Sequence, residues 1–166
     1  MPFTPYHFGP SGLLGYIFRK WIDFPVFVLA NVAVDLEVPL ISILHLGWPY
    51  HRLCHTFLIG SVVGAFCGLA AWPWRDVLGR AMEKIRIPYQ TNFLKMIISG
   101  ILGVWMHVLI DGIYHYDVKP FWPIRKNYLW RLLSQNQVKE ICIVCFVILI
   151  VLYVLSRMKT SRKTTD

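Results

Sequence analysis

The stretch GVWMHVLIDGIYH, residues 103–115, decides how this chain folds and where its chemistry lies. His107, Asp111 and His115 follow one another at intervals of four, which places their side chains on nearly the same face of an α-helix, one turn apart. The other residues of the stretch are apolar enough for a membrane helix. Ionisable side chains at such depth are costly and need partners, so they are candidates for a functional site. The stretch predicts a buried helix with three candidate metal ligands along one side.

The composition of the whole chain predicts an all-α, polytopic membrane protein. The 166 residues are 56% hydrophobic and 16% charged, with a mean hydropathy of +0.51, which is too apolar for an ordinary soluble domain. The net charge of +8 comes from basic residues at 19–20, 75–95, 119–131 and 157–163, in the gaps between apolar runs. Lysine and arginine in such gaps set membrane orientation and contact anionic lipids. We therefore expect membrane lipids as partners and no role in nucleic-acid binding.

Apolar runs predict the order of the helices in a single membrane domain, residues 1–166. Prolines within residues 1–10 make that segment an irregular entry, and Ser11 is expected to cap the first helix. We expect about four or five membrane-embedded helices, of which the first two are short for about 30 Å of hydrocarbon. The predicted segments are helices at 11–22 and 24–37, an interfacial helix at 39–47, membrane runs at 51–74 and 93–115, an amphipathic connection at 75–92, a polar loop at 116–137, an anchor helix at 138–157 and a basic tail at 158–166.

Small residues and cysteines in these runs are interpreted as packing residues. Gly60, Gly64 and Gly68 recur every four residues, a stripe that suits close contact between membrane helices. The cysteines lie in apolar runs without the tight spacing of a zinc cluster; they are Cys54, Cys67, Cys142 and Cys145.

The charge distribution predicts the orientation of the chain and brings the candidate ligands together. The basic tail and the 75–95 connection should be cytoplasmic, which places the C-terminus in the cytoplasm. The ends of the helices that carry histidine and acidic residues then all point to the outer side. A metal-site core is accordingly expected within residues 1–123.

The residue types in this core suit a divalent metal. Histidine and carboxylate ligands without thiolates favour zinc, with manganese and iron as alternatives. Asp35 and Glu37 precede Pro39 and should end a helix, where a carboxylate is unfavourable unless a cation is near. A lone membrane histidine is often only a packing residue, but several groups at matching depth favour metal binding. The candidate ligands are His7, Asp35, His51, His55, His107 and Asp111, more than one tetrahedral ion needs, so we expect two ions.

Other residues are candidates for catalysis. Glu37 could be a further ligand or the general base, and His115 could be a ligand or could support the ligands. Arg52 suits a phosphate or a neighbouring carboxylate. Lys119 and Arg125 could bind an anionic head group or simply be solvated surface residues.

Taken in order, these residues resemble a family, the membrane-bound metal-dependent hydrolases known as YdjM-like inner-membrane proteins. The resemblance covers about residues 2–123, and Glu37 at the second acidic position and the compact tract between His51 and His55 depart from the family pattern. The matching positions are His7, Asp35 with Glu37, His51-Arg52 with His55-Thr56, His107 with Asp111, and Pro120-Phe121-Trp122-Pro123. The resemblance implies a bacterial inner-membrane location and metal-dependent hydrolysis.

We expect a metal-dependent hydrolase that cleaves a phosphoester of an anionic lipid or lipid-linked substrate at the outer leaflet. One alternative is a di-iron lipid oxygenase or desaturase, although the adjacent His-His pair of those enzymes is absent. A second alternative is a non-enzymatic metal carrier or membrane scaffold. A hydrolase needs an open coordination position, whereas protein ligands saturate a structural site.

Overall fold

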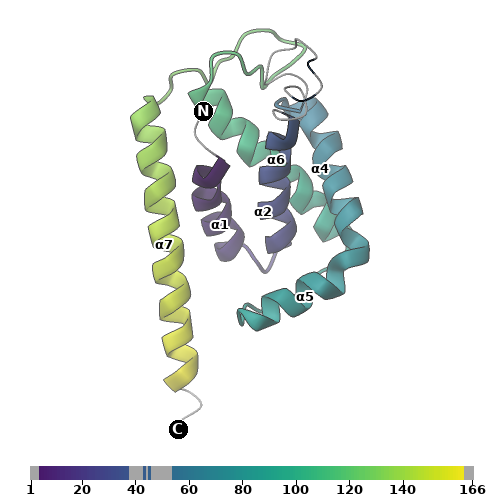
Figure 1. Cartoon of the computed structure of the whole chain (residues 1–166), viewed down its shortest axis with the longest axis vertical. Coiled ribbons are helices and arrows are strands. Elements are labelled where there is room, and N and C mark those ends of the chain that lie inside the picture. Colours follow the sequence, from purple (N-terminus) through teal and green to yellow (C-terminus); the bar gives the residue numbers. More distant parts are fainter. Residues whose placement is uncertain (1–3, 38–42, 44, 46–53, 163–166) are drawn as a thin grey trace.

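Helices make up all the regular structure in the described part of the chain. The computed structural model describes residues 4–37, 43, 45 and 54–162. Three short 3₁₀ helices, η1 (Thr4–His7), η2 (Val34–Leu36) and η3 (Trp72–Trp74), adjoin the α-helices. The α-helices are α1 (Phe8–Ile17), α2 (Phe24–Ala33), α4 (Phe57–Ala71), α5 (Arg75–Lys84), α6 (Phe93–Tyr114) and α7 (Gln135–Arg162) (Figure 1). The predicted helix at 39–47 lies outside the described residues.

The lengths of these helices confirm the predicted membrane bundle. Three helical stretches are long and apolar enough to cross a membrane, namely Phe57–Lys84, Phe93–Tyr114 and Gln135–Lys159. The 22 residues of α6 extend about 33 Å, close to the thickness of the hydrocarbon core. The stretch Phe24–Leu36 is a shorter apolar helix, as expected. Helix α5 lies across the lower end of the bundle with no buried residue, which fits the predicted amphipathic connection (Figure 1).

The beginning of the chain differs from the prediction. Residues 4–7 form η1 and α1 starts at Phe8, so the expected irregular entry is largely helical. Pro10 lies in the first turn of α1, where a backbone N–H is not needed for the helix, and it therefore does not break it. Ser11 is not a cap: its hydroxyl donates a hydrogen bond to the carbonyl of His7 at 2.6 Å, inside the helix. Helix α1 then ends at Ile17, earlier than expected.

Glycine lets α4 and α6 come into backbone contact. Gly60, Gly64 and Gly68 are the buried residues of α4. A Cβ atom on Gly64 would lie 2.5 Å from the carbonyl oxygen of Gly100, and one on Gly68 would lie 2.5 Å from that of Met96. The predicted packing role of this stripe is therefore confirmed. The close contact also keeps His55, two residues before α4, near the face of α6 that carries the candidate ligands.

A buried acidic residue fastens the turn between α1 and α2 to the start of α6. Asp23 is 1% exposed, caps α2 through Val26 N–H, and accepts hydrogen bonds from the hydroxyls of Tyr89 at 2.8 Å and Thr91 at 2.5 Å. Its own N–H donates to Ser99 Oγ at 2.6 Å. Burial and the Asp23 carboxylate raise the pKa of Tyr89, so its phenol remains a donor. The α1–α2 hairpin thus runs along α6 from near its beginning to its other end.

Asp23→Asn should lower the free energy of unfolding by about 1–2 kcal/mol, because an amide presents donors to two hydroxyls that donate to the carboxylate. Thermal unfolding of the detergent-solubilised protein measures this change. The exposed Asp76→Asn, in α5, is the control and should leave the midpoint unchanged. Equal midpoints for the two variants would contradict the anchoring role of Asp23.

Candidate metal centre

Four separate parts of the chain bring histidine and aspartate side chains to one end of the bundle. His7 ends η1, and Asp35 lies in η2, directly after α2. His55 precedes Thr56, whose side chain caps α4 by accepting from Ile59 N–H. His107 and Asp111 lie one turn apart on α6. His55 was expected on a helix, but the extended backbone of Thr56 starts the helix at Phe57, which leaves His55 in the preceding turn.

Ligand atoms of Asp35, His55, His107 and Asp111 all lie within 4.8 Å of one another. Nε2 of His107 lies 3.2 Å from Oδ1 of Asp35 and 3.2 Å from Oδ2 of Asp111. Nε2 of His55 lies 3.9 Å from the same Asp35 oxygen and 3.7 Å from the same Asp111 oxygen. A tetrahedral ion with ligands at about 2.0–2.1 Å places its ligand atoms about 3.3–3.4 Å apart. These spacings therefore fit one divalent metal ion.

Burial and charge also fit a metal. His55, His107 and Asp111 are at most 2% exposed. Polar atoms lie 3.2–3.3 Å from Nε2 of His107 and Oδ1 of Asp111, but among the described residues none forms a hydrogen bond with these atoms or with Nδ1 of His107. Buried polar atoms of this kind call for an ion or another ligand. A divalent cation would neutralise the carboxylates of Asp35 and Asp111, which would otherwise be costly in a membrane protein.

Glu37 orients His55. Its Oε2 lies 2.9 Å from Nδ1 of His55, on the opposite side of the ring from Nε2, and its carboxylate also accepts from Cys54 N–H. A carboxylate on one imidazole nitrogen fixes the tautomer that offers the other nitrogen to a metal. Burial alone would lower the pKa of His55, but hydrogen bonds to the carboxylates of Asp35 and Glu37 raise it. This placement favours an orienting role for Glu37 over a ligand or general base.

Glu37→Gln should weaken metal binding by about 10–100-fold, the usual cost of losing a group that orients a ligand. The amide can still contact Nδ1 but no longer stabilises that tautomer by its charge. A chelator competition series on the purified protein measures the affinity, with the exposed Glu83→Gln in α5 as the control. An unchanged affinity in Glu37→Gln would exclude the orienting role.

His7 supports the cluster from the other side. Its Nε2 lies 3.3 Å from Oδ1 of Asp111, whereas His55 lies near Oδ2, and its ring stacks on that of His107 at 4.2 Å between centroids. His7 is buried, so it restrains both α6 ligands. It could also share Asp111 with a second ion. The described residues provide one four-residue group, and the second ion stays a prediction.

The remaining sequence candidates are placed differently. His115 was expected to continue the ligand face of α6, but the helix ends at Tyr114 and the backbone of His115 is extended, with φ −107° and ψ 132°. Its ring packs against Tyr114, 4.8 Å between centroids, and it is not part of the metal-binding group. His51 and Arg52 lie outside the described residues.

One polar residue near the centre was not singled out from the sequence. Asn31 lies on α2 one turn before Asp35, is fully buried, and donates from Nδ2 to the carbonyl of Gly103 at 3.2 Å. It joins α2 to α6 beside the two helices' ligands. An amide side chain within an otherwise apolar helix was the sequence feature that could have indicated its role.

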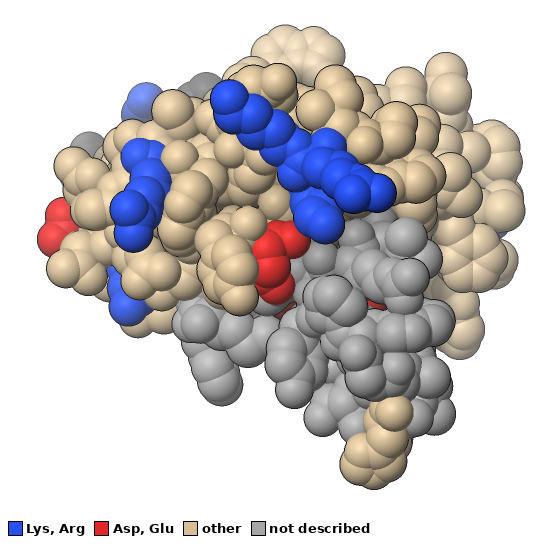
Figure 2. Space-filling view, turned by 90° about the horizontal axis from the view of Figure 1, so that it is seen from above, with Lys and Arg blue, Asp and Glu red and all other residues tan. Residues whose placement is uncertain are grey.

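Cationic side chains lie at the same end of the molecule. The loop between α6 and α7, at the top of Figure 1, contacts the start of α4 because Phe57 N–H donates to the carbonyl of Pro120 at 2.8 Å. Seen from above, Lys and Arg side chains gather on this face beside an acidic side chain (Figure 2). The exposed cations of the loop are Lys119, Arg125, Lys126 and Arg131.

Comparison with known proteins confirms the family that the sequence resembles, over bounds that differ from the expected 2–123. Neither the curated proteins nor the solved structures contained a match to this chain. The family model described as YdjM inner membrane protein matches residues 17–163, most of the chain. The matched residues include the three membrane-spanning stretches and the four residues of the His–Asp group. This protein therefore belongs to the YdjM inner membrane protein family and is an integral inner-membrane protein.

Proposed function

We propose that this protein is a metal-dependent hydrolase that cleaves a phosphoester at the membrane surface. The observation that carries the proposal is the convergence of Asp35, His55, His107 and Asp111 on one buried point. Zinc is the favoured ion, with manganese and iron as alternatives. An ion held there would supply a bound water of lowered pKa and polarise a phosphoryl oxygen.

The residues around this point have different proposed roles. His55 and His107 would hold the ion through neutral imidazoles, and the Asp35 and Asp111 carboxylates would balance its charge. Glu37 and His7 hold these ligands in place through the contacts described above. The side chain of Asp35 is 18% exposed, the most open of the four, so substrate would approach on its side. In the reaction, a water oxygen bonds to phosphorus, the ester P–O bond breaks, and the departing oxygen takes a proton.

We further propose a lipid or lipid-linked anionic substrate at the outer leaflet. The location of the cluster near the end of a membrane-spanning helix supports a lipid, and the exposed cations of the α6–α7 loop support an anionic head group. Arg52 remains the candidate for direct contact with the phosphate. The positive-inside rule supports the outer side, because the 75–95 connection carries more lysine and arginine residues than any other gap and belongs in the cytoplasm.

The test combines metal analysis with a substrate screen on the full chain in detergent. Metal content is measured by mass spectrometry after chelator-free purification, followed by phosphate or phosphomonoester release from a panel of phospholipids and a soluble aryl phosphate. Bound metal together with release that a chelator abolishes is the expected result. Stoichiometric metal without cleavage of any phosphoester would overturn the hydrolase, and bound iron with oxygen consumption would favour the oxygenase instead.

A closed structural metal site is the second candidate, because four protein ligands can saturate a tetrahedral ion. Cobalt substitution separates the two. A catalytic site should give the visible spectrum of a five- or six-coordinate ion that changes when inorganic phosphate is added. A four-coordinate spectrum insensitive to phosphate would favour the structural site.

A further inference from the structure

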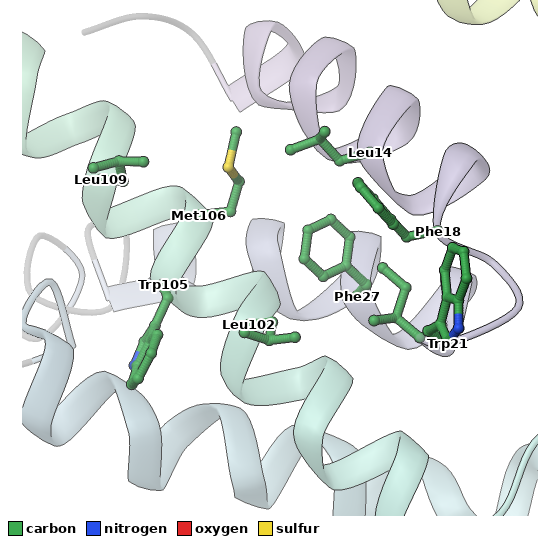
Figure 3. A pocket seen from close by; sticks show the side chains of 9 residues that line it. Leu14, Phe18, Trp21, Phe27, Leu102, Trp105, Met106 and Leu109 are labelled. Carbon is green, nitrogen blue, oxygen red and sulfur yellow. The ribbon is translucent and has the colours of Figure 1, made fainter.

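An apolar groove lies between α1, α2 and α6, beside and below the candidate metal centre. Its volume is about 670 Å³, and the side chains around it are all apolar (Figure 3). Leu14 and Phe18 approach from the α1 side, Phe27 from α2, and Leu102, Met106 and Leu109 from α6. Phe18 is 44% exposed and Trp21, at its lower rim, is 70% exposed, so the groove opens sideways. In a membrane this opening faces the lipid.

The same helices carry both the groove and the metal-binding residues. On α1, Leu14 follows His7 by seven residues, which returns it to the same face two turns lower. On α2, Phe27 precedes Asp35 by eight residues. On α6, the groove residues from Leu102 to Leu109 form the exposed stripe of the helix, whereas His107 and Asp111 lie on its buried face at the same end. With a rise of 1.5 Å per residue, the groove extends about 10–14 Å below the ligand group. This depth is close to one leaflet of a hydrocarbon core about 30 Å thick.

The residues around the groove suit a hydrocarbon chain better than another helix. Helices pack closely in membranes through small residues. The glycines of this region already face other elements, since Gly9 contacts the backbone of Cys142 in α7 and Gly103 contacts that of Phe27 in α2. The groove itself is surrounded by bulky leucine, methionine and aromatic side chains, between which a flexible chain fits and a helix backbone does not.

We propose that this groove binds one acyl chain of an anionic glycerophospholipid and directs its head group toward the end of the bundle that carries the His–Asp cluster. The charges agree with this occupant, because the exposed cations of the α6–α7 loop lie at the end where the head group would be. This inference assigns a substrate class to the proposed hydrolase. Only the role of the head group as substrate rests on that proposed function. Binding of the chain itself does not require hydrolysis.

The test is photo-crosslinking of the full-length protein in vesicles of phosphatidylethanolamine and phosphatidylglycerol. The probe is a phosphatidylglycerol with a diazirine in the middle of one acyl chain, and crosslinked peptides are identified by mass spectrometry. We expect crosslinks concentrated on α1 and on residues 102–109 of α6. Crosslinks spread evenly over the exposed apolar faces of α4 and α7 would overturn the proposal, without any variant being needed.

Leu102→Trp tests the groove directly by filling it, and should reduce crosslinking there by about tenfold. Ile98→Trp is the matched control, because Ile98 lies one turn away on α6, is 44% exposed against 36% for Leu102, and does not line the groove. Metal content should be unchanged in both variants. Full crosslinking in Leu102→Trp would overturn the proposal.

A kinetic comparison separates this inference from the hydrolase. With hydrolysis established, Leu102→Trp should raise KM for the long-chain lipid and leave hydrolysis of a soluble aryl phosphate unchanged. Groove crosslinks in a protein that cleaves no phosphoester would leave the lipid site standing and remove the hydrolase. Cleavage of phosphoesters without groove crosslinks would support the hydrolase and overturn the lipid site.

Discussion

Asp111→Asn should lower the affinity of the protein for its metal by more than about 100-fold, beyond the cost of losing an orienting group. One carboxylate oxygen of Asp111 lies 3.2 Å from Nε2 of His107, and the other lies 3.3 Å from Nε2 of His7. The substitution preserves the shape of the side chain but removes the charge that would balance the ion. Metal content after dialysis, together with chelator competition, measures the loss, and metal-dependent phosphoester hydrolysis should disappear with it.

Asp117→Asn is the control for this experiment. It makes the same chemical change six residues further along, beyond the end of α6 and outside the metal-binding group. Its metal content should equal that of the wild type. Thermal unfolding of both variants shows whether they remain folded, and wild-type metal content in a folded Asp111→Asn protein would remove this residue from the site.

Gly64→Ala should lower the free energy of unfolding by about 3 kcal/mol, at the upper end of the usual cost of overpacking. The new methyl group would lie 2.5–2.7 Å from the backbone of Gly100 and Ile101, so α4 and α6 must move apart. Backbone atoms cannot turn aside as a flexible side chain can. Because His55 lies two residues before α4 and His107 lies on α6, the movement should also weaken metal binding. Thermal unfolding and metal content measure the two effects.

Gly79→Ala provides the comparison. Gly79 lies in the exposed helix α5, where a new Cβ would be 3.4 Å from the ring of Tyr89, an ordinary contact. Alanine favours a helix by up to about 1 kcal/mol over glycine, so this variant should be as stable as the wild type or more stable. A Gly64→Ala protein that unfolds at the same midpoint would show that α4 and α6 do not depend on close glycine packing.

The helices and the small-residue contacts followed from local sequence patterns. The apolar length of 93–115 predicted a membrane helix, and the four-residue spacing of Gly60, Gly64 and Gly68 predicted close contact with another helix. Both features depend on neighbouring residues along one chain segment, which a pattern records directly. The entry segment was wrong because proline is unfavourable inside a helix but tolerated in its first turn, and the sequence does not show where that turn begins.

The sequence also predicted the candidate metal centre only in part. Spacing on one helix brought His107 and Asp111 together correctly, but it also included His115, which the end of α6 removes. The pairing of Glu37 with Nδ1 of His55 joins residues 18 positions apart, and no periodicity encodes it.

The sequence by itself determined the class of the protein, the order of its membrane helices and the residue types of a metal site. These depend on hydropathy and on the geometry of a single helix. Only the tertiary structure decided which side chains meet, because the contact of His7 with Asp111 and of Asp23 with Tyr89 joins segments far apart in the chain. The same holds for the groove, whose residues on α1, α2 and α6 become neighbours only when the hairpin packs along α6.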